Sequence, residues 1–138
     1  MRQKILSING YILVVVGFVF VALGLIAYFA GVGPFKVMLH DSMPLAILPF
    51  TEAFALAALF GIVFVRTSKQ PQYSPFWNQL ACIIHFILGS CNVVFWPFFA
   101  SGQHLKIPGV IATILHFTLA SAELYAWRLY QENQENTE

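Results

Sequence analysis

Charged residues are scarce in this sequence. Only 9% of its 138 residues are Asp, Glu, Lys or Arg, whereas 59% are hydrophobic, and the mean hydropathy is +0.74. A water-soluble domain carries about 25% charged residues, so this chain has too few charges to cover a surface that faces water. A formal net charge of +1 also gives no basis for binding nucleic acid through its phosphates. We therefore expect the surrounding solvent to be lipid.

Cysteine is scarce as well. The chain has two cysteines, Cys82 and Cys91, and no C-x-x-C pattern. Nine residues correspond to two and a half helical turns, so the two thiols face opposite sides of one helix and cannot form a disulfide with each other. Histidine spacings typical of metal sites, such as H-x-x-x-H, are absent too. The sequence therefore predicts no metal centre.

Long apolar runs, in contrast, are abundant. Four of them reach the roughly 20 residues that a helix needs to cross the hydrocarbon core. They cover residues 11–32, 43–65, 76–100 and 107–130. The short links between them favour antiparallel neighbours. We predict an all-α, polytopic integral membrane protein with an antiparallel bundle of four transmembrane helices, which forms a single domain over residues 1–130, before a polar tail over residues 131–138.

Basic residues predict the orientation of the spans. Two of them, Lys36 and Lys106, lie on one side of the predicted membrane, and five lie on the other. The five are Arg2, Lys4, Arg66, Lys69 and Arg128. By the positive-inside rule, both termini are then cytoplasmic. The first run exceeds the about 7–15 apolar residues of a signal peptide, so we expect it to be retained as a span.

Glycine recurs every seven residues in the first predicted helix, at Gly10, Gly17, Gly24 and Gly31. This period keeps the four glycines on one slowly drifting stripe of the helix. Small residues let two helix backbones approach closely in a membrane. The stripe therefore predicts helix packing, either within the chain or between two copies. Packing within the chain is favoured, because four helices joined by short links need such contacts.

Four ionisable residues fall inside the predicted spans: Glu52, His85, His116 and Glu123. Each costs about 2.5–3.5 kcal/mol on membrane-insertion scales, so each needs an explanation. On the third helix, the spacing puts His85 on one face with Asn78 and Asn92. On the fourth helix, His116 and Glu123 share a face in the same way. Two polar stripes on neighbouring helices are expected to face each other or a shared cavity.

Depth in the membrane suggests how these residues pair. At 1.5 Å per residue from the centre of each run, His85 and Glu123 lie about 4 and 7 Å toward the inner side. By the same count, His116 and Glu52 each lie about 3 Å toward the outer side. The sequence thus predicts two acid–base pairs, His85 with Glu123 and His116 with Glu52. The two histidines then differ by about 7 Å in depth, which disfavours a haem ligated by both.

A polar site between the second, third and fourth helices suits a lipid-like ligand with a polar head, such as a quinone. Histidine and glutamate can exchange protons with such a head, and Phe86, Phe95 and Phe117 can line an apolar slot. Asn78 and Asn92 would orient the ionisable groups. Acid–base catalysis on a lipid would use the same residues, so the sequence leaves open whether the protein is an enzyme.

Other functions are compatible with the same residues. The His–Glu pairs could be hydrogen-bonded clamps that hold the helices together. The chain could also be a non-catalytic accessory subunit of a larger membrane complex, or a homo-oligomer that transports protons or small solutes. The small size and the glycine stripe support the accessory subunit.

Two further patterns lie in the first half of the chain. They are Gly17-x-x-Phe20-x-x-x-Gly24 in the first predicted helix and, in the proline-led second helix, Phe50-Thr51-Glu52 followed nine residues after the glutamate by Gly61. Both are similar to patterns of the DoxX-like membrane proteins. The resemblance implies a four-helix membrane fold and an association with quinone-linked oxidoreductases. It gives Glu52 the role of the intramembrane acid, whereas His85 and Glu123 lie outside the matched pattern.

Overall fold

The described residues of the protein, 1–101 and 106–135 of a computed structural model, form helices without any strand. Among them, four helices are long and apolar enough to cross a membrane. These are α1 (Arg2–Ala30), α2 (Ile47–Thr67), α3 (Ser74–Val94) and α5 (Lys106–Glu135). Three short segments complete the chain: a π-helix η1 (Val37–Ser42), a 3-10 helix η2 (Pro44–Ala46) and the helix α4 (Trp96–Ser101). The prediction of an all-α chain with four long apolar helices is confirmed.

The third predicted span is divided in the structure. The helix α3 ends at Val94, and α4 begins at Trp96. Pro97 explains the break, because proline has no backbone N–H to bond the carbonyl of Val93 and its ring crowds the preceding turn. The fourth helix differs in the opposite way, since α5 continues through polar residues to Glu135.

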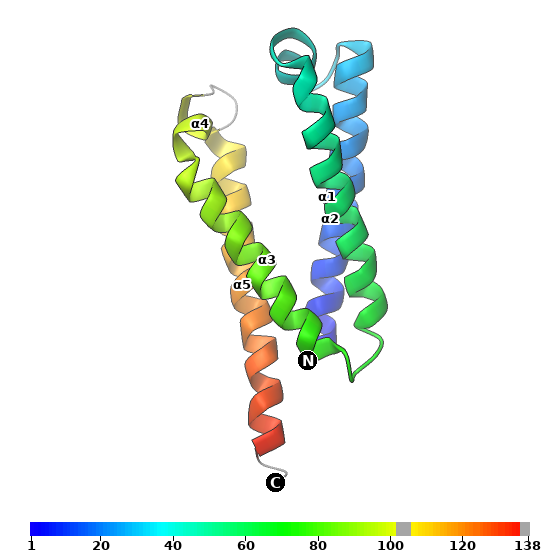
Figure 1. The fold of residues 1–138 in the computed structure, drawn as a ribbon, viewed down its shortest axis with the longest axis vertical. Helices are drawn as coiled ribbons and strands as arrows, with labels where there is room; N and C mark the ends of the chain where they lie inside the picture. The colour runs from blue at the N-terminus through cyan, green and yellow to red at the C-terminus, as the bar shows by residue number, and fades with distance from the viewer. Residues whose placement is uncertain (102–105, 136–138) are drawn as a thin grey trace. The chain divides into compact units, whose positions relative to one another are not determined.

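The chain forms two compact units: Ser7–Arg66, and Met1–Leu6 together with Thr67–Glu138. We call the first the α1–α2 unit and the second the α3–α5 unit. Both of these helix pairs appear in Figure 1, α1 beside α2 and α3 crossing α5.

Glycine holds the two helices of the α1–α2 unit close together. A Cβ atom on Gly10 would lie 2.8 Å from the carbonyl oxygen of Gly61, and one on Gly17 would lie 2.6 Å from the carbonyl oxygen of Phe54. Real Cβ atoms do not approach backbone oxygens so closely, so only glycine fits here. Residue numbers rise along α1 as they fall along α2, so these two helices are antiparallel.

The last two glycines of the stripe have different surroundings. A Cβ on Gly24 would touch the ring of Phe50 on α2. Gly31, in contrast, follows the end of α1 with a positive φ of 61°, and its N–H donates to the carbonyl of Ala27. This is the left-handed cap with which many helices end. Gly31 therefore terminates the helix and lies beside the ring of His40, which the sevenfold spacing alone did not indicate.

Small residues also shape the α3–α5 unit. The ring of Phe117 on α5 lies against Gly89 of α3, and the ring of Phe99 on α4 lies against Gly109 of α5. At the other end of α5, the guanidinium of Arg2 lies over the ring of Tyr130, 4.6 Å from its centroid. This cation–π contact connects the first residues of the chain to the end of α5.

Candidate functional site

Four polar side chains meet between α3 and α5, and we call them the polar seam: Asn78, His85, His116 and Glu123. Asn78 and His85 are seven residues apart on α3, and His116 and Glu123 are seven apart on α5. Seven residues make two helical turns, so each pair lies on one face of its helix. Because the helices are antiparallel and the spacings are equal, one register brings both pairs of opposite residues into contact.

Each contact in the seam is a hydrogen bond. Asn78 donates from Nδ2 to Oε2 of Glu123 at 2.5 Å. The Nδ1 atoms of His85 and His116 lie 3.1 Å apart, with the ring centroids 5.3 Å apart. A neutral imidazole has one nitrogen that donates and one that accepts. One of the two histidines therefore donates from Nδ1, and the other accepts at Nδ1.

The seam is enclosed by the protein. Asn78, His85 and Glu123 have no exposed surface, and His116 is half-buried. Between the two contacts, Ala81 and Ala120 are buried. Burying polar side chains is costly unless they are hydrogen-bonded, and these two contacts offset part of that cost in this helix pair.

The structure corrects the depth count. It brings His85 to His116 and Glu123 to Asn78, in place of the expected pairing of His85 with Glu123. The count took the centre of residues 76–100, but α3 ends at Val94, which moves its centre four residues, or about 6 Å, toward the N-terminus. The expected 7 Å difference in depth between the histidines is therefore wrong.

A haem between these histidines still fits poorly, for another reason. Two nitrogens on opposite sides of one metal ion are about 4 Å apart, since each metal–nitrogen bond is about 2 Å. The Nδ1 atoms of His85 and His116 are closer than that and face each other directly. Across the described ranges, no three His, Cys, Asp or Glu side chains are placed to share a metal ion.

Two of the predicted site residues lie apart from the seam. Asn92 is half-buried on α3, two turns or about 10 Å beyond His85 along the axis, which is too far to orient that imidazole. Glu52 belongs to the α1–α2 unit and is exposed on α2. The expected pair of Glu52 with His116 would join the two units and stays a prediction.

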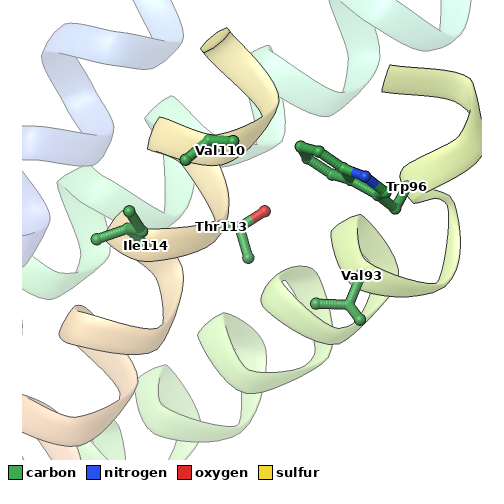
Figure 2. Close-up of a pocket in the computed structure, with 5 residues that line it drawn as sticks. All are labelled: Val93, Trp96, Val110, Thr113 and Ile114. Carbon is green, nitrogen blue, oxygen red and sulfur yellow. The ribbon is translucent and has the colours of Figure 1, made fainter. Parts of the chain in front are cut away.

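Near the seam is an apolar cavity of about 180 Å³. It is open to the surroundings of the protein, because Val93, Val110 and Ile114 in its wall are exposed. It is lined by Val93, Trp96, Val110, Thr113 and Ile114. Figure 2 shows the Thr113 hydroxyl on the side that faces Trp96, and this hydroxyl donates to the carbonyl of Gly109 at 2.7 Å. Thr113 is one helical turn from His116 on α5, so the cavity is next to the histidine pair.

The aromatic slot expected from the sequence is built differently. Phe86 and Phe95 are exposed, and Phe117 packs on Gly89. The valines that line the cavity in their place carried no signal in the sequence, because apolar residues occur at most positions of these helices. The meeting of the two histidines did have a signal, namely the equal spacing of seven residues in both polar stripes.

Comparisons of the chain with family models, with curated proteins and with solved structures gave no match. The similarity to DoxX-like proteins thus stays a prediction from the residues of the first half.

Proposed function

We propose that this chain is a multi-pass integral membrane protein, folded as an antiparallel four-helix bundle with cytoplasmic termini, that binds a lipid-like or quinone-like molecule beside the polar seam. The four long apolar helices support the membrane location. The excess of basic residues on one side supports the orientation. The function itself is supported by the chemistry around the cavity.

The observation that carries the proposal is the contact of His85 with His116 one helical turn from an apolar cavity. The volume of about 180 Å³ is similar to that of a closed apolar cavity of about 150 Å³ that holds benzene, so a six-membered ring fits in this open cavity by size. The Trp96 indole N–H can donate a hydrogen bond to a ring carbonyl. The Thr113 hydroxyl already donates to Gly109, but its oxygen can accept a hydrogen bond from a hydroxyl group of the reduced ring. An imidazole ring has one nitrogen that donates and one that accepts a hydrogen bond, so it can give a proton to a redox-active head or take one from it.

The test is to find the molecule. The full chain is purified from membranes in mild detergent, extracted with organic solvent and analysed by mass spectrometry for quinones and lipids. We expect one compound to accompany the wild-type chain in near-stoichiometric amount. His116→Leu should reduce its occupancy about tenfold, which corresponds to about 1.4 kcal/mol of binding energy. Thr118→Leu, an exposed position on the same helix, is the matched control.

Two results would contradict this function. One is a wild-type protein that carries no compound at all. The other is a visible absorption spectrum with the Soret band of a haem, because the histidine contact leaves no space for a macrocycle between the rings.

A second function is favoured by Glu52. Its carboxyl is exposed on α2 among exposed leucines, Leu48, Leu56 and Leu59. A carboxyl on an apolar face of a membrane helix needs a polar partner, and a neighbouring subunit can supply one. As an accessory subunit, the protein would co-purify with other chains, and Glu52→Leu would release them without changing the amount of bound small molecule. Native mass spectrometry measures both.

A further inference from the structure

Basic side chains gather at the end of the α3–α5 unit where the chain begins. The guanidinium of Arg2 lies over the ring of Tyr130, 4.6 Å from its centroid. The first six residues of the chain belong to the same compact unit as α5. Lys4 on α1 and Arg128 on α5 are therefore at the same end of this unit, and both are exposed.

A third basic residue, Lys69, comes from the link between α2 and α3. This link is ordered by hydrogen bonds, because the N–H of Tyr73 donates to the carbonyl of Gln70 and the Ser74 hydroxyl donates to the carbonyl of Pro71. Since α3 is antiparallel to α5, the link lies at the same end of the unit as the last turns of α5. Lys69 is exposed, so its ammonium group projects from a fixed backbone.

These three exposed side chains have no acidic partner within the chain. Lys4, Lys69 and Arg128 form no ion pair across the residues that the structure describes, where the ion pairs involve Asp41. Two acidic residues of this end, Glu132 and Glu135, follow Arg128 on α5. They are about 6 and 10 Å further along the helix axis, away from the apolar part of the unit. Positive charge is therefore nearest to the apolar helices.

Aromatic residues occur at the same level as the basic ones. Tyr73 is exposed at the start of α3, and Trp127 is half-buried next to Arg128 on α5. Tyrosine and tryptophan prefer the depth of the lipid headgroups. The basic side chains are thus at the depth where headgroup phosphates lie, and the exposed ring of Phe76 can contact the adjoining acyl chains.

We propose that Lys4, Lys69 and Arg128 form a binding surface for anionic phospholipids, with Arg2 held beside them by the ring of Tyr130. Lysine and arginine form charge-assisted hydrogen bonds with phosphate oxygens. Each basic residue close to an anionic leaflet strengthens binding about fivefold. A free phosphate would gain only these charge contacts, whereas a lipid also contacts the apolar helices. The inference rests on the membrane location proposed above but not on a ligand in the cavity.

The test is the lipid selectivity of the full chain in phosphatidylcholine bilayers with a trace of spin-labelled phosphatidylglycerol or phosphatidylcholine. Electron spin resonance distinguishes lipids in contact with the protein from those in the free bilayer. We expect the wild type to prefer phosphatidylglycerol, and less so at high salt, because salt screens exposed charges. Each of Lys4→Gln, Lys69→Gln and Arg128→Gln should reduce the preference by up to about fivefold. Lys106→Gln is the matched control and should keep it, because Lys106 is exposed at the other end of α5, about 33 Å from Arg128.

Equal association of the two lipids with the wild type would overturn the proposal, as would an equal loss of preference in Lys106→Gln. Displacement of phosphatidylglycerol by inorganic phosphate, beyond the effect of chloride at the same ionic strength, would overturn the choice of a lipid over a free anion. A chain that does not enter bilayers would contradict the membrane location as well. The three variants should retain as much of the cavity-bound compound as the wild type, so the cavity ligand and this surface can fail separately.

Discussion

The Nδ1 atoms of His85 and His116 face each other at 3.1 Å, so two identical side chains have to adopt different hydrogen-bonding states. One imidazole donates from Nδ1 and has its acceptor nitrogen at Nε2, whereas the other accepts at Nδ1 and carries its proton on Nε2. The pair can exchange these roles only if both rings move their protons. Replacing either residue leaves the remaining Nδ1 without its partner.

We expect the two histidines to be energetically coupled. His85→Phe, His116→Phe and the double variant are compared by reversible unfolding in mixed micelles. Interhelical hydrogen bonds measured in a membrane protein average about 0.6 kcal/mol and reach about 1.7 kcal/mol, and the coupling energy should fall in this range. The same cycle with Thr118→Val in place of His116→Phe is the control, because Thr118 is exposed and should give additive effects. Additive effects for the histidines would contradict the contact.

The register of α3 against α5 can be tested by cross-linking. Ala81 and Ala120 are buried midway between the two hydrogen-bonded contacts. Cysteines at both positions, in a chain with Cys82→Ala and Cys91→Ala, should form a disulfide on mild oxidation, because the two hydrogen-bonded contacts on either side put these positions opposite each other. Loss of thiol alkylation, read by mass spectrometry, measures this. Cysteines in place of Ala81 and the exposed Thr118 form the control pair, and their thiols should still react with the alkylating reagent after oxidation. Cross-linking of this control pair instead would show that the helices pack in another register.

Bulk on the glycine stripe should destabilise the α1–α2 unit. In Gly17→Leu, even the Cβ atom would lie 2.6 Å from the carbonyl oxygen of Phe54, so the helices must move apart. Overpacking costs about 1–3 kcal/mol, and the midpoint of thermal unfolding in detergent should fall accordingly. Ala22→Leu adds bulk to an exposed position of α1 and should leave the midpoint unchanged. Equal midpoints for the two variants would argue against this packing.

Filling the cavity should remove the bound molecule without unfolding the protein. Val110 lines the cavity, and Val110→Phe places a ring where the ligand ring is proposed to bind. Extraction and mass spectrometry should then show less of the compound found with the wild type. Ile111→Phe is the matched control on the next, exposed position of α5 and should keep wild-type occupancy. Retention by both variants would locate the molecule elsewhere.

Hydropathy was sufficient to predict the helices but not where they end. Apolar residues continue from α3 into α4, so the run in the sequence conceals the break that Pro97 introduces. Likewise, α5 extends past the apolar run because a helix continues through Gln131 and Glu132 as long as nothing interrupts its backbone hydrogen bonds. Both errors concern the ends of helices, which depend on backbone hydrogen bonds. Hydropathy is summed over side chains and carries no information on these bonds.

The candidate site was predicted in composition but not in pairing. The polar residues of the seam could be identified, because ionisable groups are conspicuous in an apolar helix. The partner of each residue was predicted from its depth in the membrane. An error of four residues in the position of the centre of α3 was enough to give His85 the wrong partner. Matching the seven-residue spacing of Asn78 and His85 with that of His116 and Glu123 needs no helix centre and gives the observed contacts. The cavity beside Trp96 could not be foreseen, since it depends on how α3 ends.

The glycine contacts between α1 and α2 bear on how the protein is made. These two helices are synthesised first and can close on each other through backbone contacts alone, since the residues at the contacts are glycine and apolar. The helix α3 cannot be completed in this way, because Asn78 and His85 lack their partners until α5 has left the ribosome. If the protein is inserted into a membrane as proposed, we therefore expect α3 to stay next to the insertion machinery until α5 is made. The two helices would then enter the bilayer together as a hairpin.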